Sequence, residues 1–313
     1  MAEPDLTLPS SSAAEPATVV LAGATGALGL LIAHHLRQRG AAVRALVRPQ
    51  ARASAEAASL RLQGAELVEV DYGQADQLRQ ACAGASCVVS ALSGLREVIV
   101  EAQTRLLEAA VAAGVPRFIP SDFSIDYTRL PDGSNRNLDL RREFQRRLDQ
   151  APIQATSILN GMFTDLLTGQ APVILMGPRR VVYWGDADQP LDFTTMRDTA
   201  AFTAAAALDP AAPRYLRVAG EVASIRGLQA AAEAATGQEF KLFRVGSLSA
   251  FGKVIKLTKA LVPAPNEVFP PWQGMQYLHN MFSGWPKLEP LDNARYPEIS
   301  WTPVRAVLAP SRA

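Results

Sequence analysis

Lysine is nearly absent from this sequence, which has 26 arginines but only 5 lysines among its 313 residues. The first lysine is Lys241, so the first 240 residues cannot use lysine in any chemistry. Cysteine is also scarce, and the only two, Cys82 and Cys87, exclude a disulfide framework. Their spacing does not fit structural zinc sites, and the three histidines add no metal-ligand pattern. We therefore expect no metal, and we interpret both thiols as small buried hydrophobic side chains.

An excess of one charge and long apolar runs are lacking as well. Lysine plus arginine (31) nearly balances aspartate plus glutamate (30), so no global field favours nucleic acid or an anionic membrane. No apolar run reaches the roughly 20 residues that span a bilayer. Residues 1–16 lack the basic and apolar regions of a secretory signal, and we interpret them as a disordered leader. The sequence thus predicts a cytoplasmic protein without nucleic-acid or membrane partners.

Short apolar runs alternate with helical patterns through the first half of the chain. Residues 18–22 form a continuous β-branched run, typical of a strand buried on both faces. Leu28, Ile32 and Leu36 then have helical spacing, and Gly40 follows as a helix end. Further strands are expected at 42–47, 66–70, 86–91, 117–120 and 155–159, and helices at 74–83, 96–113 and 137–150. This alternation predicts an α/β fold with a doubly wound parallel sheet, a Rossmann domain over residues 17–160.

The second half is less regular and differs in composition. We expect a hairpin of 173–175 with 181–183, helices at 200–208, 225–235 and 248–262, and strands at 215–218 and 239–245. Residues 263–271 contain four prolines and predict a loop or an extended connector, beyond which lie three of the four tryptophans. We interpret residues 161–313 as a smaller α+β cap that binds the substrate and returns some strands to the main sheet. Such a cap would cover the carboxyl edge of the sheet, where α/β proteins bind ligands.

Glycines at 23, 26 and 29 form a G-x-x-G-x-x-G pattern between the first strand and the first helix. Gly23 would permit a sharp turn, Gly26 would let the backbone approach a pyrophosphate, and Gly29 would let the helix pack against the sheet. The alternative is a glycine-rich turn without a ligand. The residues predicted to bind the cofactor here are Gly23, Ala24, Thr25, Gly26, Leu28 and Gly29.

The end of the second strand predicts which cofactor is bound. A carboxylate there would bind the ribose of NAD, but this chain has Arg48, which suits the 2′-phosphate of NADP(H), with Arg52 close enough to help. A surface arginine is the alternative. Asp71 and Tyr72 follow the third strand and are expected to line the adenine pocket, although a turn aspartate is equally compatible. Ala91 and Leu92, after the fourth strand, are expected to pass the cofactor ribose.

Several segments resemble one known family. VLAGATGALG (20–29), LVR (46–48), VDY (70–72) and AAGVPRFIPSDF (112–123) are similar to the NmrA-like and isoflavone-reductase-like branch of the atypical short-chain dehydrogenases. The segment at 126–144 and the tail at 291–309 also resemble bacterial members of that branch. The resemblance implies an NADP-binding Rossmann domain with a smaller C-terminal substrate region. It also implies hydride transfer from NADPH to an aromatic substrate, as in the plant reductases of the branch.

One position departs from this branch. Its reductases carry a lysine early in the helix after the fifth strand, and counting back from Ile153 places Arg141 there. An arginine can stabilise a developing negative charge, but it is a poor proton donor. No Tyr-x-x-x-Lys pair occurs either. Arg141 is therefore a candidate electrostatic catalyst, and a solvated helix residue is the alternative.

Other residues near the nicotinamide must come from strand ends. Ser121, Asp122 and Phe123 follow the fifth strand, and Asn160 follows the sixth. We expect Ser121, Phe123 and Asn160 to contact the cofactor, although Phe123 could equally be core. Asp122 is a candidate acid–base group or a turn cap, and Tyr127 is a second candidate proton donor.

Three functions are compatible with these features. The first is an NADPH-dependent reductase that acts on a small aromatic or carbonyl compound, and a homodimer is compatible with this function. The second is a non-catalytic NADP(H)-sensing regulator of the NmrA type, which the arginine at position 141 favours. The third is an interaction module in which the cofactor is structural. The aromatic-rich cap favours a substrate pocket and hence the reductase.

Overall fold

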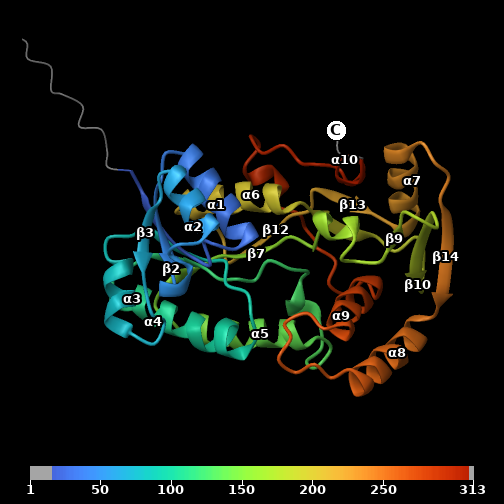
Figure 1. Ribbon diagram of the computed structural model, residues 1–313, viewed down its shortest axis with the longest axis horizontal. Coiled ribbons are helices and arrows are strands. Elements are labelled where there is room, and N and C mark those ends of the chain that lie inside the picture. The colour runs from blue at the N-terminus through green and yellow to red at the C-terminus, as the bar shows by residue number, and fades with distance from the viewer. Residues whose placement is uncertain (1–15, 310–313) are drawn as a thin grey trace, which may run out of the picture.

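The computed structural model of the protein describes residues 16–309 (Figure 1). Of the predicted leader, residues 1–16, only Pro16 lies within the described residues. A doubly wound α/β core occupies one half of the molecule, and a mixed region of short strands and helices occupies the other.

Six parallel strands form the main sheet, in the order β3-β2-β1-β4-β5-β6. Their bounds are β1 (Thr18–Ala22), β2 (Ala42–Val47), β3 (Glu66–Glu69), β4 (Cys87–Ser90), β5 (Arg117–Ile119) and β6 (Gln154–Ala155). The chain winds outward in one direction from β1 to β3 and then crosses to β4, so the strand order reverses between β1 and β4. The predicted doubly wound Rossmann sheet is confirmed, and the reversal defines the crevice where such sheets bind ligands.

Helices cover both faces of this sheet. They are α1 (Ala27–Gln38), α2 (Ala55–Leu62), α3 (Ala75–Cys82), α4 (Gln103–Ala112), α5 (Arg136–Leu148) and α6 (Met196–Leu208). Figure 1 shows α1, α2 and α6 above the sheet and α3, α4 and α5 below it. The helix predicted from residue 96 begins as a π-helical segment over Glu97–Ala102. No helix was predicted at α2, where only Ala57 and Leu60 are buried, because two apolar positions make too weak a stripe.

One strand of the C-terminal half pairs with the short strand that follows β6 in the chain, in a separate two-stranded sheet. β7 (Ser157–Leu159) continues the line of β6 and pairs in parallel with β12 (Tyr215–Arg217). The tail covers the free edge of β12, since the Arg217 amide donates to Asp292 Oδ2 at 2.8 Å and the Asp292 amide donates to the Arg217 carbonyl at 2.7 Å. The family-like tail segment thus protects a sheet edge.

Two small sheets and four helices make up the rest. One sheet has the order β14-β10-β9 and the other β13-β11-β8. The elements are β8 (Met162–Phe163), β9 (Ile174–Leu175), β10 (Arg180–Trp184), β11 (Leu191–Thr194), β13 (Glu221–Ala223), β14 (Lys241–Gly246), α7 (Ile225–Thr236), α8 (Leu248–Leu261), α9 (Pro271–Phe282) and α10 (Val304–Leu308). The predicted hairpin is confirmed, because β9 and β10 pair antiparallel. The short strands β8, β11 and β13 and the helices α9 and α10 were not predicted.

Three buried clusters form the core. One lies between the sheet and α1 with α6, one lies between the sheet and α3, α4 and α5, and the third fills the C-terminal half. Cys82 and Cys87 are both buried free thiols, as predicted. Burial raises the pKa of Cys82 to about 11 and that of Cys87 to about 12, which makes both thiols unreactive.

Candidate active site

The glycine loop joins β1 to α1 at the carboxyl edge of the sheet. Two of its glycines are required by the fold itself. A Cβ on Gly23, whose φ is +73°, would lie 2.4 Å from the Ala91 carbonyl oxygen, and one on Gly29 would lie 2.2 Å from the Gly23 carbonyl oxygen. Gly26 is exposed, and an added Cβ would find its nearest neighbour at 3.3 Å. Helix α1 starts after Gly26 without a side-chain cap or an acidic residue in its first turn, so its first N–H groups suit an anion.

The other predicted loop residues differ in exposure. Ala24 is fully buried in the core, so that only its backbone could approach a ligand. Thr25 and Leu28 are half-buried. The loop therefore offers a ligand mainly backbone N–H groups.

Residues that follow β2 and β3 surround the predicted 2′-phosphate position. Arg48 is exposed, and within residues 16–309 its guanidinium has no hydrogen-bond partner. Burial raises the pKa of the Tyr72 hydroxyl, and the charge of Arg48 opposes that rise. Tyr72 is therefore within electrostatic reach of Arg48. Arg52 is paired with Glu69, with Nη1 3.0 Å from Oε2. Asp71 Oδ1 accepts a hydrogen bond at 2.8 Å from the backbone amide of Gly73, as in an Asx turn. Among the four predicted residues, Arg48 is the one with an unengaged charge.

The ends of β4 and β5 are held together beside the glycine loop. Ser121 Oγ donates to the Leu92 carbonyl at 2.6 Å, so this serine fixes the loop after β4. Phe123 is buried and belongs to the core cluster that contains residues of α1 and α6. Asn160 is fully buried, and neither atom of its side-chain amide has a hydrogen-bond partner within the described chain. Such an orphaned amide at a strand end is a candidate contact for a ligand.

Arg141 lies half-buried on the inner side of α5. Its Nη1 donates to the Asn137 carbonyl at 3.1 Å, while its buried Nε has no partner in the described residues. Burial raises the pKa of Asp122 and of Tyr277, and the charge of Arg141 opposes both rises, so both side chains are within electrostatic reach of this guanidinium. The guanidinium is therefore held on one side and free to accept an anionic group on the other.

Asp122 is the centre of a buried hydrogen-bond network. Its Oδ2 accepts from the Tyr127 hydroxyl at 2.8 Å and from Ser157 Oγ at 2.6 Å. Arg214 Nη1 donates to Ser157 Oγ at 2.6 Å, and its Nη2 donates to Asp149, which follows the last residue of α5. Burial raises the pKa of Asp122, although the two hydroxyls and Arg141 oppose the rise. Oδ1 is buried without a partner in the described chain, which makes it the oxygen best placed to hold a proton.

Tyr127 is less suited to proton donation than the sequence suggested. Its side chain is fully buried, and its hydroxyl donates to Asp122. Burial raises the pKa of Tyr127 well above its usual value, and the neighbouring carboxylate raises it further. This geometry makes Tyr127 a residue that positions the Asp122 carboxyl group.

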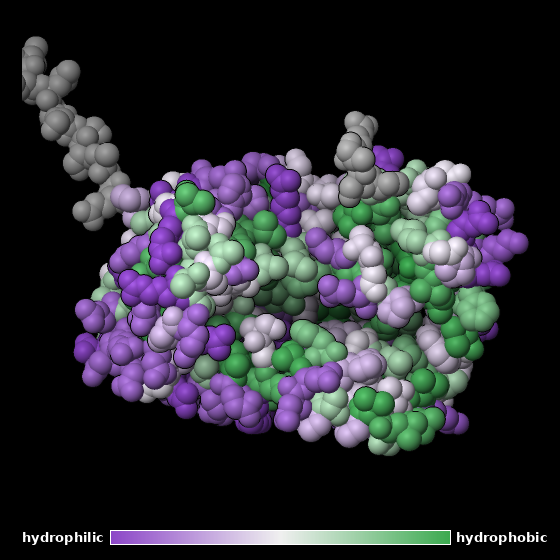
Figure 2. All heavy atoms as spheres, in the orientation of Figure 1, coloured by the Kyte–Doolittle hydropathy of each residue, from purple (hydrophilic) through white to green (hydrophobic). Residues whose placement is uncertain are grey.

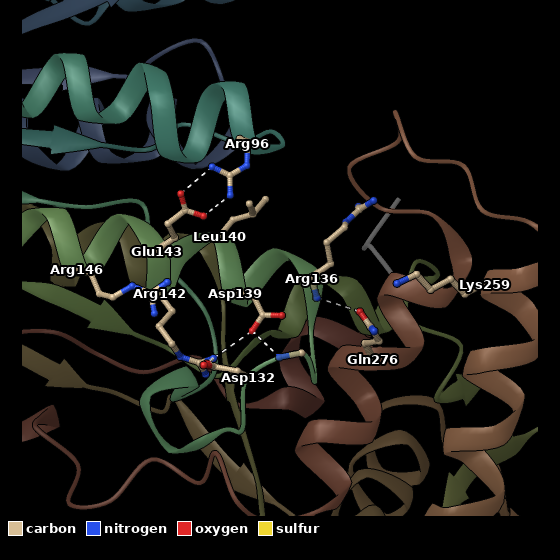
Figure 3. A pocket seen from close by; sticks show the side chains of 11 residues that line it. Arg96, Asp132, Arg136, Asp139, Leu140, Arg142, Glu143, Arg146, Lys259 and Gln276 are labelled. Atoms are coloured by element: carbon tan, nitrogen blue, oxygen red, sulfur yellow. Dashed lines mark hydrogen bonds and ion pairs between the residues drawn. The ribbon is translucent and has the colours of Figure 1, made fainter.

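An open groove with a volume of about 390 Å³ lies on another side of α5 (Figure 3). Arg96 and Glu143 pair across it, with Arg96 Nη1 2.7 Å from Glu143 Oε1, and Lys259 reaches it from α8. Arg141 does not line this groove, so α5 separates it from the candidate catalytic group. The arginines of α5 thus lie on two sides of the helix, with Arg141 on one side and Arg136, Arg142 and Arg146 beside the groove.

Several residues of the site were not foreseen. Ser157 and Arg214 belong to the Asp122 network but lie far from Asp122 in the sequence, and Tyr277 is on the unpredicted helix α9. Lys259 could have been noticed in the sequence, because the chain has so few lysines that few positions could supply an amine to the groove. Residues 16–309 contain no cluster of three or more His, Cys, Asp or Glu side chains that could hold a metal ion.

Comparison with known protein sequences finds relatives that are named as reductases. Pinoresinol reductase 1 of Arabidopsis thaliana is 31% identical over 214 residues, which are 64% of this chain and 67% of that protein. The bifunctional pinoresinol-lariciresinol reductase of Linum perenne is 27% identical over 243 residues, 72% of this chain and 77% of that protein. The matched regions thus span about two thirds to three quarters of these relatives.

Solved structures show the same fold. The structure of AtPrR2 with NADP+ and (+)-pinoresinol superposes with a TM-score of 0.78 at 23% identity and covers 94% of this chain and 98% of that one. A crystal structure of isoflavone reductase gives a TM-score of 0.79 at 21% identity, with the same coverage. The model of the NmrA-like family matches residues 15–294, which confirms the resemblance seen in the sequence. The chain belongs to the NmrA-like family.

Proposed function

We propose that the protein is an NADPH-dependent reductase of a small aromatic or carbonyl compound. The observation that carries the proposal is the carboxyl edge of the sheet. There the uncapped α1 N-terminus, the open Gly26 and Arg48, which is unpaired within residues 16–309, provide sites for pyrophosphate and 2′-phosphate groups. The relatives named above are reductases, and AtPrR2 was solved with NADP+. These names favour a reductase over a regulator.

The residues present fit the cofactor. The α1 N-terminus would bind its pyrophosphate and Arg48 its 2′-phosphate, while the orphaned Asn160 amide offers a donor and an acceptor near the strand ends. NADPH, when bound, supplies a hydride. The chain itself must then place the substrate and stabilise the charge that develops on it.

Arg141 is proposed to stabilise that charge. A guanidinium stays protonated at all physiological pH values, so Arg141 can hold an oxyanion but cannot protonate it. An ionised Asp122 would compete with the substrate for Arg141. Because burial favours the protonated form of Asp122, a proton on Oδ1 leaves the Arg141 charge available to the substrate. Tyr127 and Ser157 keep Oδ2 occupied and so direct that proton to Oδ1.

A screen of NADPH oxidation tests the proposal. The panel should contain aromatic ketones, aldehydes and conjugated enones together with pinoresinol, and NADPH binding should be measured in parallel. Turnover of any compound supports the reductase. Tight NADPH binding without turnover, together with a cofactor-dependent change in proteolysis beyond residue 160, would instead support the NADP(H)-sensing alternative.

Location and assembly belong to the proposal as well. A cytoplasmic location and a homodimer rest on the sequence, and cell fractionation and sedimentation equilibrium test them. Within residues 16–309, no helix combines the length and the apolar character that crossing a membrane requires. The boundary between a cofactor domain, 17–160, and a substrate region, 161–313, is also proposed, and limited proteolysis tests it.

A further inference from the structure

The end of the molecule formed by β14 and α8 exposes an unusual number of apolar side chains. Twelve large hydrophobic residues of the described chain are exposed, and seven of them fall between residues 243 and 269. They are Phe243, Val245, Val254, Leu257, Leu261, Val262 and Phe269. Figure 2 shows apolar surface at the lower right, over the place where Figure 1 labels α8. A patch of this kind on a soluble domain usually marks an interaction surface.

Helix α8 is attached to the protein by a narrow face. Only Phe251 and Ile255 of this helix are buried. Val254, Leu257 and Leu261 follow one another at helical spacing and form a second apolar stripe, in which Leu257 is 59% and Leu261 72% exposed. The stripe is therefore an apolar face that the described chain leaves uncovered.

The segment that forms this surface, residues 241–262, carries charge of one sign. Residues 241–262 carry five cationic side chains and no carboxylate, and Glu239 and Glu267 are the nearest acidic residues along the chain. The five are Lys241, Arg244, Lys253, Lys256 and Lys259. Four of the five lysines of the whole chain thus lie in one segment of 22 residues, although the net charge of the protein is only +1.

We propose that the β14–α8 surface, residues 241–262, docks on an anionic lipid surface. An amphipathic helix with leucines on one face and lysines beside them is the usual interfacial anchor, since the apolar side chains enter the lipid while the lysines contact anionic headgroups. A second copy of this chain fits less well, because a two-fold contact would bring the same five cations face to face. The expectation that no membrane partner exists relied on net charge, which does not reveal a local cluster.

Docking would bring the groove beside α5 close to the membrane. Lys259 of α8 also lines the groove beside α5, and its Nζ lies 4.8 Å from the centre of the Trp272 ring. A docked α8 would therefore hold this groove close to the lipid surface. The docking itself does not depend on the proposed reductase activity.

Co-sedimentation of the full-length protein with vesicles tests the proposal. We expect binding to phosphatidylcholine vesicles that contain phosphatidylglycerol, little binding to phosphatidylcholine alone, and weaker binding at high salt. Lys253→Gln/Lys256→Gln should weaken binding about 25-fold, since each lysine contributes about fivefold. Leu257→Gln/Leu261→Gln should weaken it about tenfold or more.

Matched variants elsewhere on the surface serve as controls. Arg61→Gln/Arg105→Gln removes the same net charge from exposed positions, and Leu62→Gln changes a leucine that is 90% exposed on α2. Both should bind anionic vesicles like the unaltered protein, and NADPH affinity should be unchanged in all variants. The proposal is overturned if anionic vesicles are not bound or if the control variants lose as much. It is also overturned if sedimentation without lipid shows that the α8 variants dissociate an oligomer, because the face would then join two copies.

Discussion

Replacing Arg48 by alanine should remove the preference for NADPH over NADH. Arg48 is exposed and unpaired in the described structure, so its loss breaks no bond within the protein and should leave the free energy of unfolding nearly unchanged. A charge-assisted contact to the 2′-phosphate contributes about 1.5–3 kcal/mol, which corresponds to roughly 10- to 150-fold in the NADPH dissociation constant. The NADH dissociation constant should change less than about twofold. Isothermal titration calorimetry with both cofactors measures this difference.

Arg52 provides the matched control for this experiment. Its guanidinium already pairs with Glu69 at 3.0 Å, and both side chains are exposed, so Arg52→Ala should cost NADPH affinity less than Arg48→Ala does. Equal losses of NADPH and NADH affinity in Arg48→Ala would refute the assignment of Arg48 to the 2′-phosphate. A larger loss in Arg52→Ala would move that role to Arg52.

Three further predictions concern the loop, the buried carboxyl and the N-terminus. Gly26→Val should abolish cofactor binding in calorimetry and keep the melting temperature within a few degrees, whereas Gly29→Ala should lower it strongly, because its Cβ would lie 2.2 Å from a backbone oxygen. The raised folded pKa of Asp122 favours its protonated form, so its stabilisation is present at acidic pH and is lost as pH rises through that pKa. Urea denaturation should therefore show Asp122→Asn gaining stability relative to the unaltered protein as pH rises, by at most about 1.4 kcal/mol per pH unit, and a constant difference would contradict this. Deleting residues 1–16 should leave melting temperature and NADPH affinity unchanged, and a clear drop in either would show that the segment contributes to the fold.

The central strands β1, β4 and β5 of the main sheet could be predicted because they are almost completely buried. β1 has the bounds expected from its continuous apolar run, and β2 has the bounds expected from its alternation of apolar and polar residues. Where burial is partial, the prediction was poorer. α2 buries two residues, and α9 begins at Pro271 directly after a proline-rich stretch that predicted only a connector. Proline is tolerated at the first position of a helix, so this stretch hid a helix start.

The candidate site shows a similar division. The topology of parallel sheets brings strand ends to one edge, which is why the places of Gly26, Arg48 and Ser121 could be predicted. The partners of Asp122 could not, because Ser157 and Arg214 reach it through tertiary contacts that no local pattern records. The same applies to the β12 edge contact of the tail, whose role in the sheet only the structure reveals.

The central claim is that the protein reduces a substrate whose developing charge Arg141 stabilises. Single-turnover oxidation of bound NADPH, with a compound found in the screen, tests it most directly. Arg141→Ala should slow this step about 100-fold or more while NADPH affinity stays within a few-fold, since an electrostatic contact of this kind contributes a few kcal/mol to the transition state. Arg141→Lys should retain or raise the rate, and Arg146→Ala, an exposed arginine on the same helix, should leave it unchanged. An unchanged rate in Arg141→Ala would contradict the account and remove Arg141 from the mechanism.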